Sequence, residues 1–317
     1  MVKINASIHE LTQIEGLINK KICVPVSKSK KKKEILDSMQ DNEKYYFHTF
    51  IEEKDFKDLE LPFLESQVQL KIVKAKIEYP TKTRQDNNNN FLPKKDRLNI
   101  IYIDVLFFTL KNKHYAVITT SNATNRNRIL KLIGEENIKN SEDLKIDNDL
   151  FNWLMYVYEE SKGKINNNIK LENISGFVGN VMDDTNVFSG NSEHTTELTV
   201  TKAFISNGGE LSKVGIRIRH HEVVDISFFI DDNSNISIDY SSSEDLILLN
   251  TVKNYIGEEV FYILYIYCFL INELKRLYNI ESQEFKDTSK KAYSKKIGLE
   301  VIKSIMLENE IKLHELT

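Results

Sequence analysis

The chain has 317 residues, of which 41% are hydrophobic and 28% are charged, a composition typical of folded globular proteins. With 11 Gly, 4 Pro and 2 Cys, the sequence excludes a collagen-like chain and a small disulfide-rich domain. The formal net charge of −4 gives no overall attraction for a polyanion, so nucleic-acid binding would depend on local clusters of Lys and Arg.

The sequence has no features of a membrane or secreted protein. Its longest apolar run, Val260–Ile271, is shorter than the roughly 20 residues that a membrane-spanning helix needs. The first residues lack the basic and apolar regions of a signal peptide. Cys23 and Cys268 lie far apart in apolar surroundings, which is typical of reduced core thiols. We therefore expect a cytoplasmic protein without membrane insertion.

The N-terminal residues, 1–86, are predicted to form a small mixed α/β domain. Apolar residues at helical spacing follow Ser7, which predicts a helix over residues 7–21 with Ser7 as its N-cap. Apolar and polar residues alternate at 67–79, which predicts a strand, and another strand is predicted at 44–51.

A polar segment follows at residues 87–97. It contains a run of Asn residues and Pro93, which favour turns and loops over helices and strands. The sequence therefore predicts a linker here, with residues 98–317 forming the larger second part of the protein.

The most informative stretch of the chain begins after this linker. Two apolar segments, Leu98–Leu110 and His114–Thr120, are separated by Lys111–Lys113, which predicts a β-hairpin. The next segment, Ser121–Arg128, is rich in helix-capping residues and leads into the apolar Ile129–Ile133. The sequence therefore predicts a hairpin followed by a short basic helix.

The start of this helix is the best candidate for a binding site. The first turn of a helix has backbone N–H groups without intrahelical partners, and these attract anions. Thr124 adds a hydroxyl, while Arg126 and Arg128 add guanidinium groups that form charge-assisted hydrogen bonds with phosphate. Lys131 adds a further cation one turn later. We expect these four residues to contact the phosphates of a nucleic acid.

The rest of the chain is predicted to combine strands and helices. A helix is predicted over residues 143–160, and long C-terminal helices over 241–278 and 287–316. Strands are predicted between them, at residues 169–181, 197–206, 214–230 and 235–240. The expected fold class is α+β, with a central, mostly antiparallel sheet, a small mixed N-terminal domain and long C-terminal helices.

A second basic candidate lies within residues 214–230. Because side chains alternate along a strand, Arg217 and Arg219 share one face and Ile216 and Ile218 the other. Such a pair of Arg residues can follow a phosphate backbone, and we expect both to contact nucleic acid. Further Lys-rich segments, more typical of solvated surface, occur at residues 28–33, 94–97 and 286–296.

No catalytic, metal or cofactor site is predicted. The loop Asp231–Asn235 begins like a calcium site, but Ile236 stands where such a loop needs Gly. His220 and His221 point to opposite faces of a regular strand, which is poor geometry for joint metal ligation. We therefore expect a protein without enzymatic activity.

The segment Tyr255–Tyr278 is apolar on nearly all sides of the predicted helix. Such a helix is buried in its own domain or against another subunit, and Tyr is enriched at the centre of subunit interfaces. We expect a homodimer that forms through this aromatic helix.

The order of these parts resembles the RexA-type phage-exclusion proteins and, more loosely, the KwaB-type anti-phage proteins. The matching portion, about Leu98 to Tyr278, comprises the hairpin ending in Ala116-Val-Ile-Thr-Thr-Ser-Asn122, the basic helix start, the β-rich middle and the helical C-terminal part. The resemblance implies DNA binding, self-association and a role in phage defence. It implies no catalytic residues, and residues 1–86 have no counterpart in it.

We therefore expect a non-enzymatic, largely sequence-independent DNA-binding protein with double-stranded DNA as its partner, acting in bacterial anti-phage defence. Two alternatives remain open. A metal-dependent nuclease would need Asp183, Asp184 and Glu197 to converge on one pocket. A protein-interaction module, such as a sensor or inhibitor subunit, would dock through the C-terminal helices.

Overall fold

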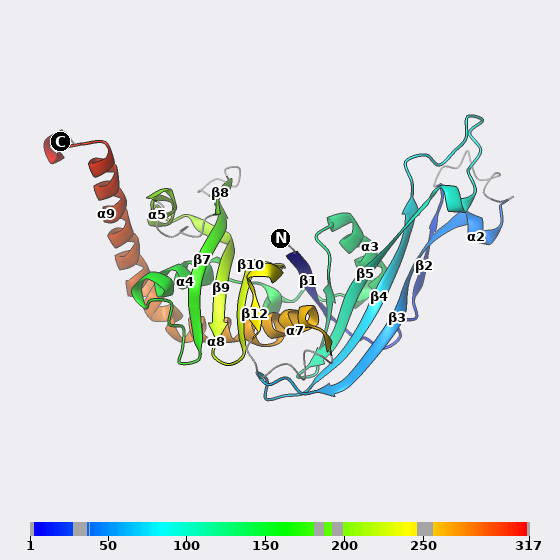
Figure 1. The fold of residues 1–317 in the computed structure, drawn as a ribbon, viewed down its shortest axis with the longest axis horizontal. Coiled ribbons are helices and arrows are strands. Elements are labelled where there is room, and N and C mark those ends of the chain that lie inside the picture. Colours follow the sequence, from blue (N-terminus) through cyan, green and yellow to red (C-terminus); the bar gives the residue numbers. More distant parts are fainter. Residues whose placement is uncertain are drawn as a thin grey trace. The chain divides into compact units, whose positions relative to one another are not determined.

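The fold is known from a computed structural model that describes residues 3–27, 37, 39–180, 187–191, 199–245 and 256–315. These residues include twelve strands, and every strand pair with a described register is antiparallel. A long helix lies near the C-terminus (Figure 1). The predicted α+β fold class is therefore confirmed.

The chain divides into two compact units, and neither is continuous in the sequence. Unit 1 comprises Met1–Asn5, Pro62–Leu64 and Asp143–Thr317, and unit 2 comprises Ala6–Leu61 and Glu65–Glu142. The division therefore does not fall at the predicted linker, because residues 87–97 lie inside unit 2. The chain passes from unit 1 into unit 2 within its first strand, β1 (Lys3–Leu11).

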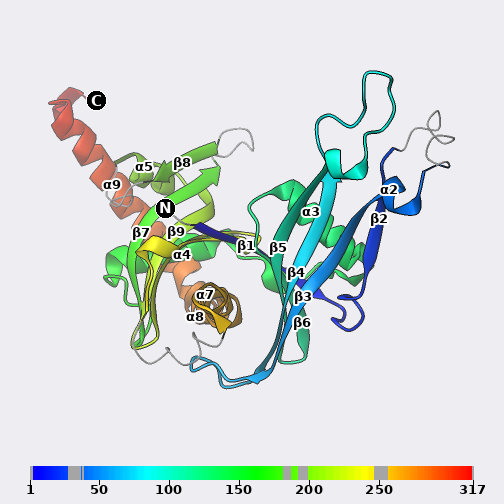
Figure 2. The same ribbon diagram turned by 45° about the vertical axis from the view of Figure 1, so that its right-hand side comes forward.

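Unit 2 is built on a sheet with the strand order β2-β3-β4-β5-β6-β1 (Figure 2). Both strands predicted in the N-terminal part are confirmed, as are both strands of the hairpin. A single helical turn, α2 (Asp41–Lys44), precedes β3. The strands are β2 (Lys21–Pro25), β3 (Tyr45–Leu59), β4 (Val68–Pro80), β5 (Leu98–Leu110) and β6 (Lys113–Ile118).

Helix α3 (Ala123–Ile133) packs on one face of the unit 2 sheet and is the predicted basic helix (Figure 2). Its Ile129, Leu132 and Ile133 are fully buried in a core shared with the strands. Such burial contributes roughly 1.5–3 kcal/mol for each large apolar side chain. The helix ends at Gly134, whose φ of 98° is a conformation that favours Gly.

The helix predicted over residues 7–21 is wrong, because its first residues belong to strand β1. This strand pairs with β6, from Ser7 opposite Ile118 to Leu11 opposite His114. Ile8 and Leu11 are three residues apart, which fits one face of a helix; in β1 they lie on opposite faces of the strand, and both are buried. The deciding factor is the open edge of β6, a long-range partner that local spacing does not reveal.

The polar segment predicted as a linker joins the neighbouring strands β4 and β5, which pair from Pro80 opposite Leu98 onward. The carboxylate of Asp86 closes its turn by accepting hydrogen bonds from the backbone N–H groups of Asn88 and Asn90, both at 2.9 Å. The segment is therefore a long strand connection within one unit.

Arg97, at the end of this connection, is fully buried. Its guanidinium donates to the Glu43 carboxylate at 3.0 Å, to the Glu43 carbonyl at 2.6 Å and to the Leu92 carbonyl at 2.6 Å. It also donates to the Tyr46 hydroxyl at 3.3 Å. These bonds satisfy a buried charge and attach the connection to α2 and β3.

Unit 1 contains a second antiparallel arrangement, with the strand order β11-β10-β9-β7-β8 and β12 beside β10. Helix α4 (Asn148–Glu160) contacts β7 and β9, and its Trp153 is buried. The strands are β7 (Ile169–Asn180), β8 (Val187–Asn191), β9 (Glu210–His220), β10 (Val224–Asp231), β11 (Ile236–Asp239) and β12 (Glu244–Asp245).

The strand predicted over residues 197–206 is wrong, because Thr199–Ser206 form helix α5. Its β-branched and aromatic residues favour a strand by intrinsic propensity. In the structure, Thr201, Phe204 and Ile205 form one buried face at helical spacing, and α5 packs against α9 (Lys290–Glu308). Tertiary packing therefore overrides the local preference.

The aromatic segment predicted as one helix from residue 241 is helical only from α7 (Glu258–Leu264) onward. A π-helical turn over Tyr265–Leu270 connects α7 to α8 (Ile271–Glu284). The predicted start is wrong, because residues 240–242 form a 3-10 turn and Glu244–Asp245 pair with β10; residues 246–255 lie outside the described part. The predicted final helix corresponds to α9.

The aromatic side chains of this segment are buried within unit 1. Phe261, Tyr262 and Tyr265 are almost fully covered, and Tyr265 donates to or accepts from the Nδ1 atom of His220 at 3.2 Å. The ring of Phe63 contacts Tyr265 with centroids 5.2 Å apart. The aromatic rings in the described part of this segment therefore pack mainly inside unit 1, and the dimer expected to form through it stays a prediction.

The Arg97 bonds predict a large effect on stability. Replacing Arg97 with Met should lower the free energy of unfolding by roughly 3–5 kcal/mol, because the partly buried carbonyl groups of Glu43 and Leu92 lose their Arg97 donor and the Glu43 carboxylate keeps only the Lys94 backbone N–H, at 2.8 Å. Urea unfolding followed by circular dichroism measures this loss. Arg84→Gln, at an exposed position in the same connection, is the control and should change stability by less than about 0.5 kcal/mol. A similar small loss for Arg97→Met would contradict the structural role.

Candidate nucleic-acid interface

The first turn of α3 contains backbone N–H groups with and without hydrogen-bond partners. The Asn122 side chain accepts from the backbone N–H of Asn125 at 3.0 Å, and the Asn122 carbonyl accepts from that of Arg126 at 2.9 Å. Within the described residues, the N–H groups of Ala123 and Thr124 have no such partner. The first turn also contains no acidic residue. These features suit an anion, because both the free donors and the helix dipole favour negative charge here.

Arg126 lies on the side of α3 that faces β1. Its charge acts on His9, a β1 residue whose Nε2 atom is buried without a hydrogen-bond partner. Burial and then the Arg126 charge lower the pKa of His9 to about 4. His9 is therefore neutral at neutral pH, and the positive charge at this side of the helix belongs to Arg126.

Arg128 lies on the opposite side of α3, toward β4. Its guanidinium is 4.7 Å from the ring centroid of Tyr79 and donates to the Asn125 side chain at 2.9 Å. Burial and the Arg128 charge lower the pKa of His48, although a hydrogen bond to the Glu78 carbonyl at 3.2 Å opposes the shift. The ring and the amide orient Arg128 without neutralising its charge.

The structure brings the four predicted α3 residues together on one helix. Thr124 and Lys131 are exposed, and Arg126 and Arg128 are partly buried on its two flanks. Within the described part of the chain, no carboxylate forms an ion pair with any of these cations. Their charges are therefore free to act on a ligand. Neither His9, His48 nor Tyr79 was predicted, because their distance from α3 in the sequence gives no local signal.

The second predicted pair lies on β9 of unit 1. Arg217 forms a bidentate ion pair with Asp225 of β10, at 2.8 and 3.1 Å, and this interaction raises the pKa of Arg217. Most of its charge is therefore neutralised within the strand pair. Arg219 is exposed and forms no ion pair among the described residues. The two Arg residues share a face, as predicted, but only Arg219 has a guanidinium available to a phosphate.

Several other sequence candidates fall outside the part of the chain that the structure describes. Lys30–Lys33, Asp183, Asp184, Glu193 and Glu197 lie outside the described residues, as does Lys28. Lys202, which follows these acids closely in the sequence, donates to Glu300 at 2.6 Å. Over the ranges that the structure describes, no group of His, Cys, Asp and Glu residues is arranged to hold a metal ion. In those same ranges, no helix is long and apolar enough to span a membrane.

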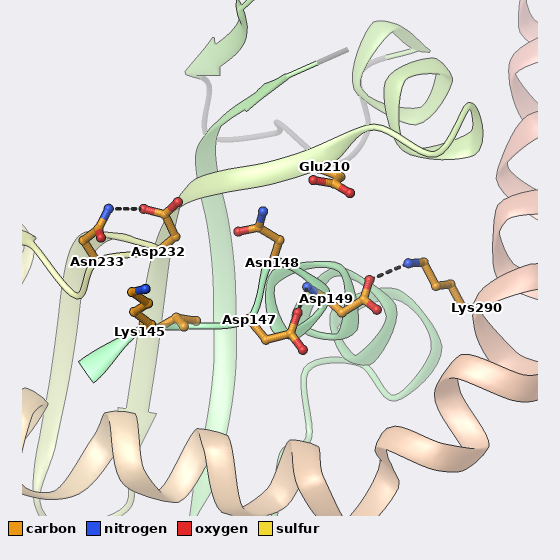
Figure 3. A pocket seen from close by; sticks show the side chains of 9 residues that line it. Lys145, Asp147, Asn148, Asp149, Glu210, Asp232, Asn233 and Lys290 are labelled. Carbon is orange, nitrogen blue, oxygen red and sulfur yellow. Dashed lines mark hydrogen bonds and ion pairs between the residues drawn. The ribbon is translucent and has the colours of Figure 1, made fainter. Parts of the chain in front are cut away.

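Unit 1 also contains a polar cavity of about 560 Å³ at the start of α4 (Figure 3). Asp149 pairs with Lys290, and Asp147 caps the helix by accepting from the Asp149 N–H at 2.9 Å. Burial and the charge of Asp231 raise the pKa of Asp232. The lining comprises Lys145, Ile146, Asp147, Asn148, Asp149, Glu210, Asp232, Asn233 and Lys290. Because acids outnumber lysines in this lining, the cavity does not suit a phosphate.

Comparison with known proteins adds no assignment to this geometry. No protein-family model matches the chain, and no curated protein is significantly similar to it.

The buried state of His9 predicts a pH dependence of stability. An unfolded His has a pKa near 6.5, so below that pH the unfolded chain takes up a proton that folded His9, with a pKa of about 4, does not. The free energy of unfolding therefore keeps the full contribution of neutral His9 above about pH 6.5. This contribution is lost as the pH falls toward 4, by about 2 kcal/mol between pH 7.5 and pH 5. Urea unfolding across this range measures the loss.

His9→Gln should remove about 2 kcal/mol of this dependence, since Gln does not titrate. His221→Gln, which changes an exposed histidine, is the matched control and should leave the dependence unchanged. An equal pH dependence in wild type and His9→Gln would show that His9 is not held neutral by the fold.

Proposed function

We propose that this protein binds nucleic acid, with double-stranded DNA as the main partner, largely without regard to sequence. The observation that carries this proposal is the start of α3, where free backbone N–H groups lie beside Arg126 and Arg128 with no described carboxylate paired to either cation. Phosphate contacts of this kind position a protein on a duplex but do not read its bases. The expected specificity is therefore low.

Thr124 and Lys131 complete the α3 contact in this proposal. Both are exposed, and they lie seven residues apart, two helical turns along the same face. In unit 1, Arg219 is the better candidate for a phosphate contact, because Asp225 occupies Arg217. Arg217 contacts a phosphate only where that phosphate displaces the Asp225 carboxylate from its guanidinium.

The resemblance to the RexA and KwaB types supports a role in bacterial anti-phage defence. A DNA-binding component without sequence preference suits such a role, since phage DNA offers no single recognition site. We keep self-association as part of the proposal. A metal-dependent nuclease and a protein-interaction module remain the alternatives, and incubation of DNA with the protein and Mg²⁺ or Mn²⁺ separates the nuclease from a binder.

The proposal predicts a salt-dependent loss of binding in an α3 variant. Arg126→Gln with Arg128→Gln should weaken binding to a duplex by about tenfold or more at low salt, because two phosphate contacts are lost. The slope of log affinity against log salt should fall in magnitude by about 1.8. Fluorescence anisotropy with a labelled duplex, titrated at several salt concentrations, measures both quantities.

A matched control removes two positive charges elsewhere in unit 2. Lys82→Gln with Arg84→Gln changes two exposed cations of the β4–β5 connection and should alter affinity by less than about twofold, apart from the general charge effect. Equal losses in the two double variants would mean that net charge, rather than the α3 start, determines binding.

A further inference from the structure

One half of the unit 2 sheet has exposed side chains on the face opposite α3. Strand β6 pairs with β5 only over Val105–Leu110, so the segment Leu98–Asp104 forms an edge and this half has the four strands β2, β3, β4 and β5. Ile103 packs into the core shared with α3. Because side chains alternate, Ile100 and Tyr102 point to the other face.

Four residues form a continuous row across this face, one from each strand. Lys21 is directly opposite Thr49, Thr49 is opposite Lys76, and Lys76 is opposite Tyr102. With neighbouring strands about 4.8 Å apart, the row spans roughly 14 Å. Its two cations are thus separated by a hydroxyl and followed by an aromatic ring. We call the surface formed by Lys21, Phe47, Lys76, Ile100 and Tyr102 the open face.

The open face carries a net positive charge. The ammonium groups of Lys21 and Lys94 lie 3.9 and 4.2 Å from the ring centroid of Phe47. Lys94 also pairs with Glu78 at 2.7 Å, and Lys76 lies 3.8 Å from the same side chain. Two of these lysines, Lys76 and Lys94, therefore lie beside one carboxylate, and the Glu78 side chain is only 8% exposed. An anion meets ammonium groups here before it meets Glu78, and Asp104, the exposed acid next to Tyr102 on this face, lies 3.9 Å from the ammonium group of Lys74.

The aromatic part of the open face is accessible. Tyr102 is 54% exposed and Ile100 is 41% exposed, which is high for large side chains in the middle of a strand. A flat ring next to ammonium groups is the arrangement on which unpaired bases stack while their phosphates meet the cations. Bases within a duplex are already stacked on both sides, so this surface favours a single strand.

We propose that the open face binds single-stranded nucleic acid, with a base stacked on Tyr102 and phosphates held by Lys21 and Lys76. The site uses none of the α3 residues and lies on the other face of the sheet. It therefore does not require the proposed duplex contact, although both would give unit 2 an affinity for nucleic acid. The unit would then hold a duplex and a single strand on different faces.

The test uses fluorescence anisotropy of the full-length protein with labelled oligo-dT, oligo-rU and a duplex. Tyr102→Ala should weaken binding to the single strands by roughly tenfold, as expected for the loss of one stacked base, with little effect on the duplex. Tyr102→Phe keeps the ring and should bind like the wild type. Lys21→Gln with Lys76→Gln should weaken single-strand binding and reduce its salt dependence.

Two controls keep the outcome decisive. Lys291→Gln with Lys295→Gln removes two exposed cations from α9 in unit 1 and should leave single-strand binding unchanged. Circular dichroism and urea unfolding confirm that each variant is folded, and the exposed position of Tyr102 makes a folding defect small. Normal single-strand binding by Tyr102→Ala, or equal losses in Tyr102→Ala and Tyr102→Phe, would overturn the stacking proposal.

The failures of the two proposals are distinguishable. If the wild type binds the duplex but no single strand, the open face is not a nucleic-acid site, and a protein partner becomes its expected occupant. If single strands bind and the duplex does not, the α3 proposal fails and the open-face proposal stands. Loss of duplex binding alone in the Arg126→Gln, Arg128→Gln variant would support two separate sites.

Discussion

The packing of α3 onto the unit 2 sheet is the contact on which the functional surfaces depend. Ile129, Leu132 and Ile133 are buried at positions that fix both the rotation of the helix and the place where it starts. Arg126 and Arg128 are thereby held on opposite flanks, and the free N–H groups lie between them. The same contact occupies one face of the sheet, and Ile100 and Tyr102 on the other face are exposed to solvent.

This packing also has an electrostatic effect. His9 and His48 lie on the sheet face that α3 covers, and burial lowers the pKa of both rings. A neutral ring beneath a guanidinium adds no competing charge, so the helix start keeps the cations of its own sequence. Weakening the helix contact would hydrate the rings and permit their protonation, which links the stability of this contact to pH.

Local sequence patterns were sufficient to predict an element where interactions between residues close in the sequence determine its conformation. The hairpin, its polar turn and the basic helix were predicted because alternation, turn residues and an Asn cap all act within a few residues. β1 and α5 were not, since a strand edge and a neighbouring helix decide their conformation from far away in the sequence. The division into units escaped prediction for the same reason, because a polar segment between paired strands looks like a linker.

The candidate site shows a similar limit. Thr124, Arg126, Arg128 and Lys131 are close in sequence and could be chosen together, whereas the open face takes one or two residues from each of four strands. Arg217 illustrates the opposite problem, since its partner Asp225 becomes a neighbour only when the β9–β10 pairing forms. A Lys or Arg in a sequence is a candidate phosphate contact, but only the folded chain shows whether it already forms an ion pair with an acid.

The interleaved course of the chain has a consequence for dissecting the protein. Pro62–Leu64 is part of unit 1 although unit 2 surrounds it in the sequence, and the ring of Phe63 sits among Phe261, Tyr265 and Phe269. Expressing residues 143–317 alone would omit that ring and leave a void in an aromatic core. Genetic truncation therefore cannot isolate either half intact, and roles must be separated by point substitutions or by circularly permuted chains.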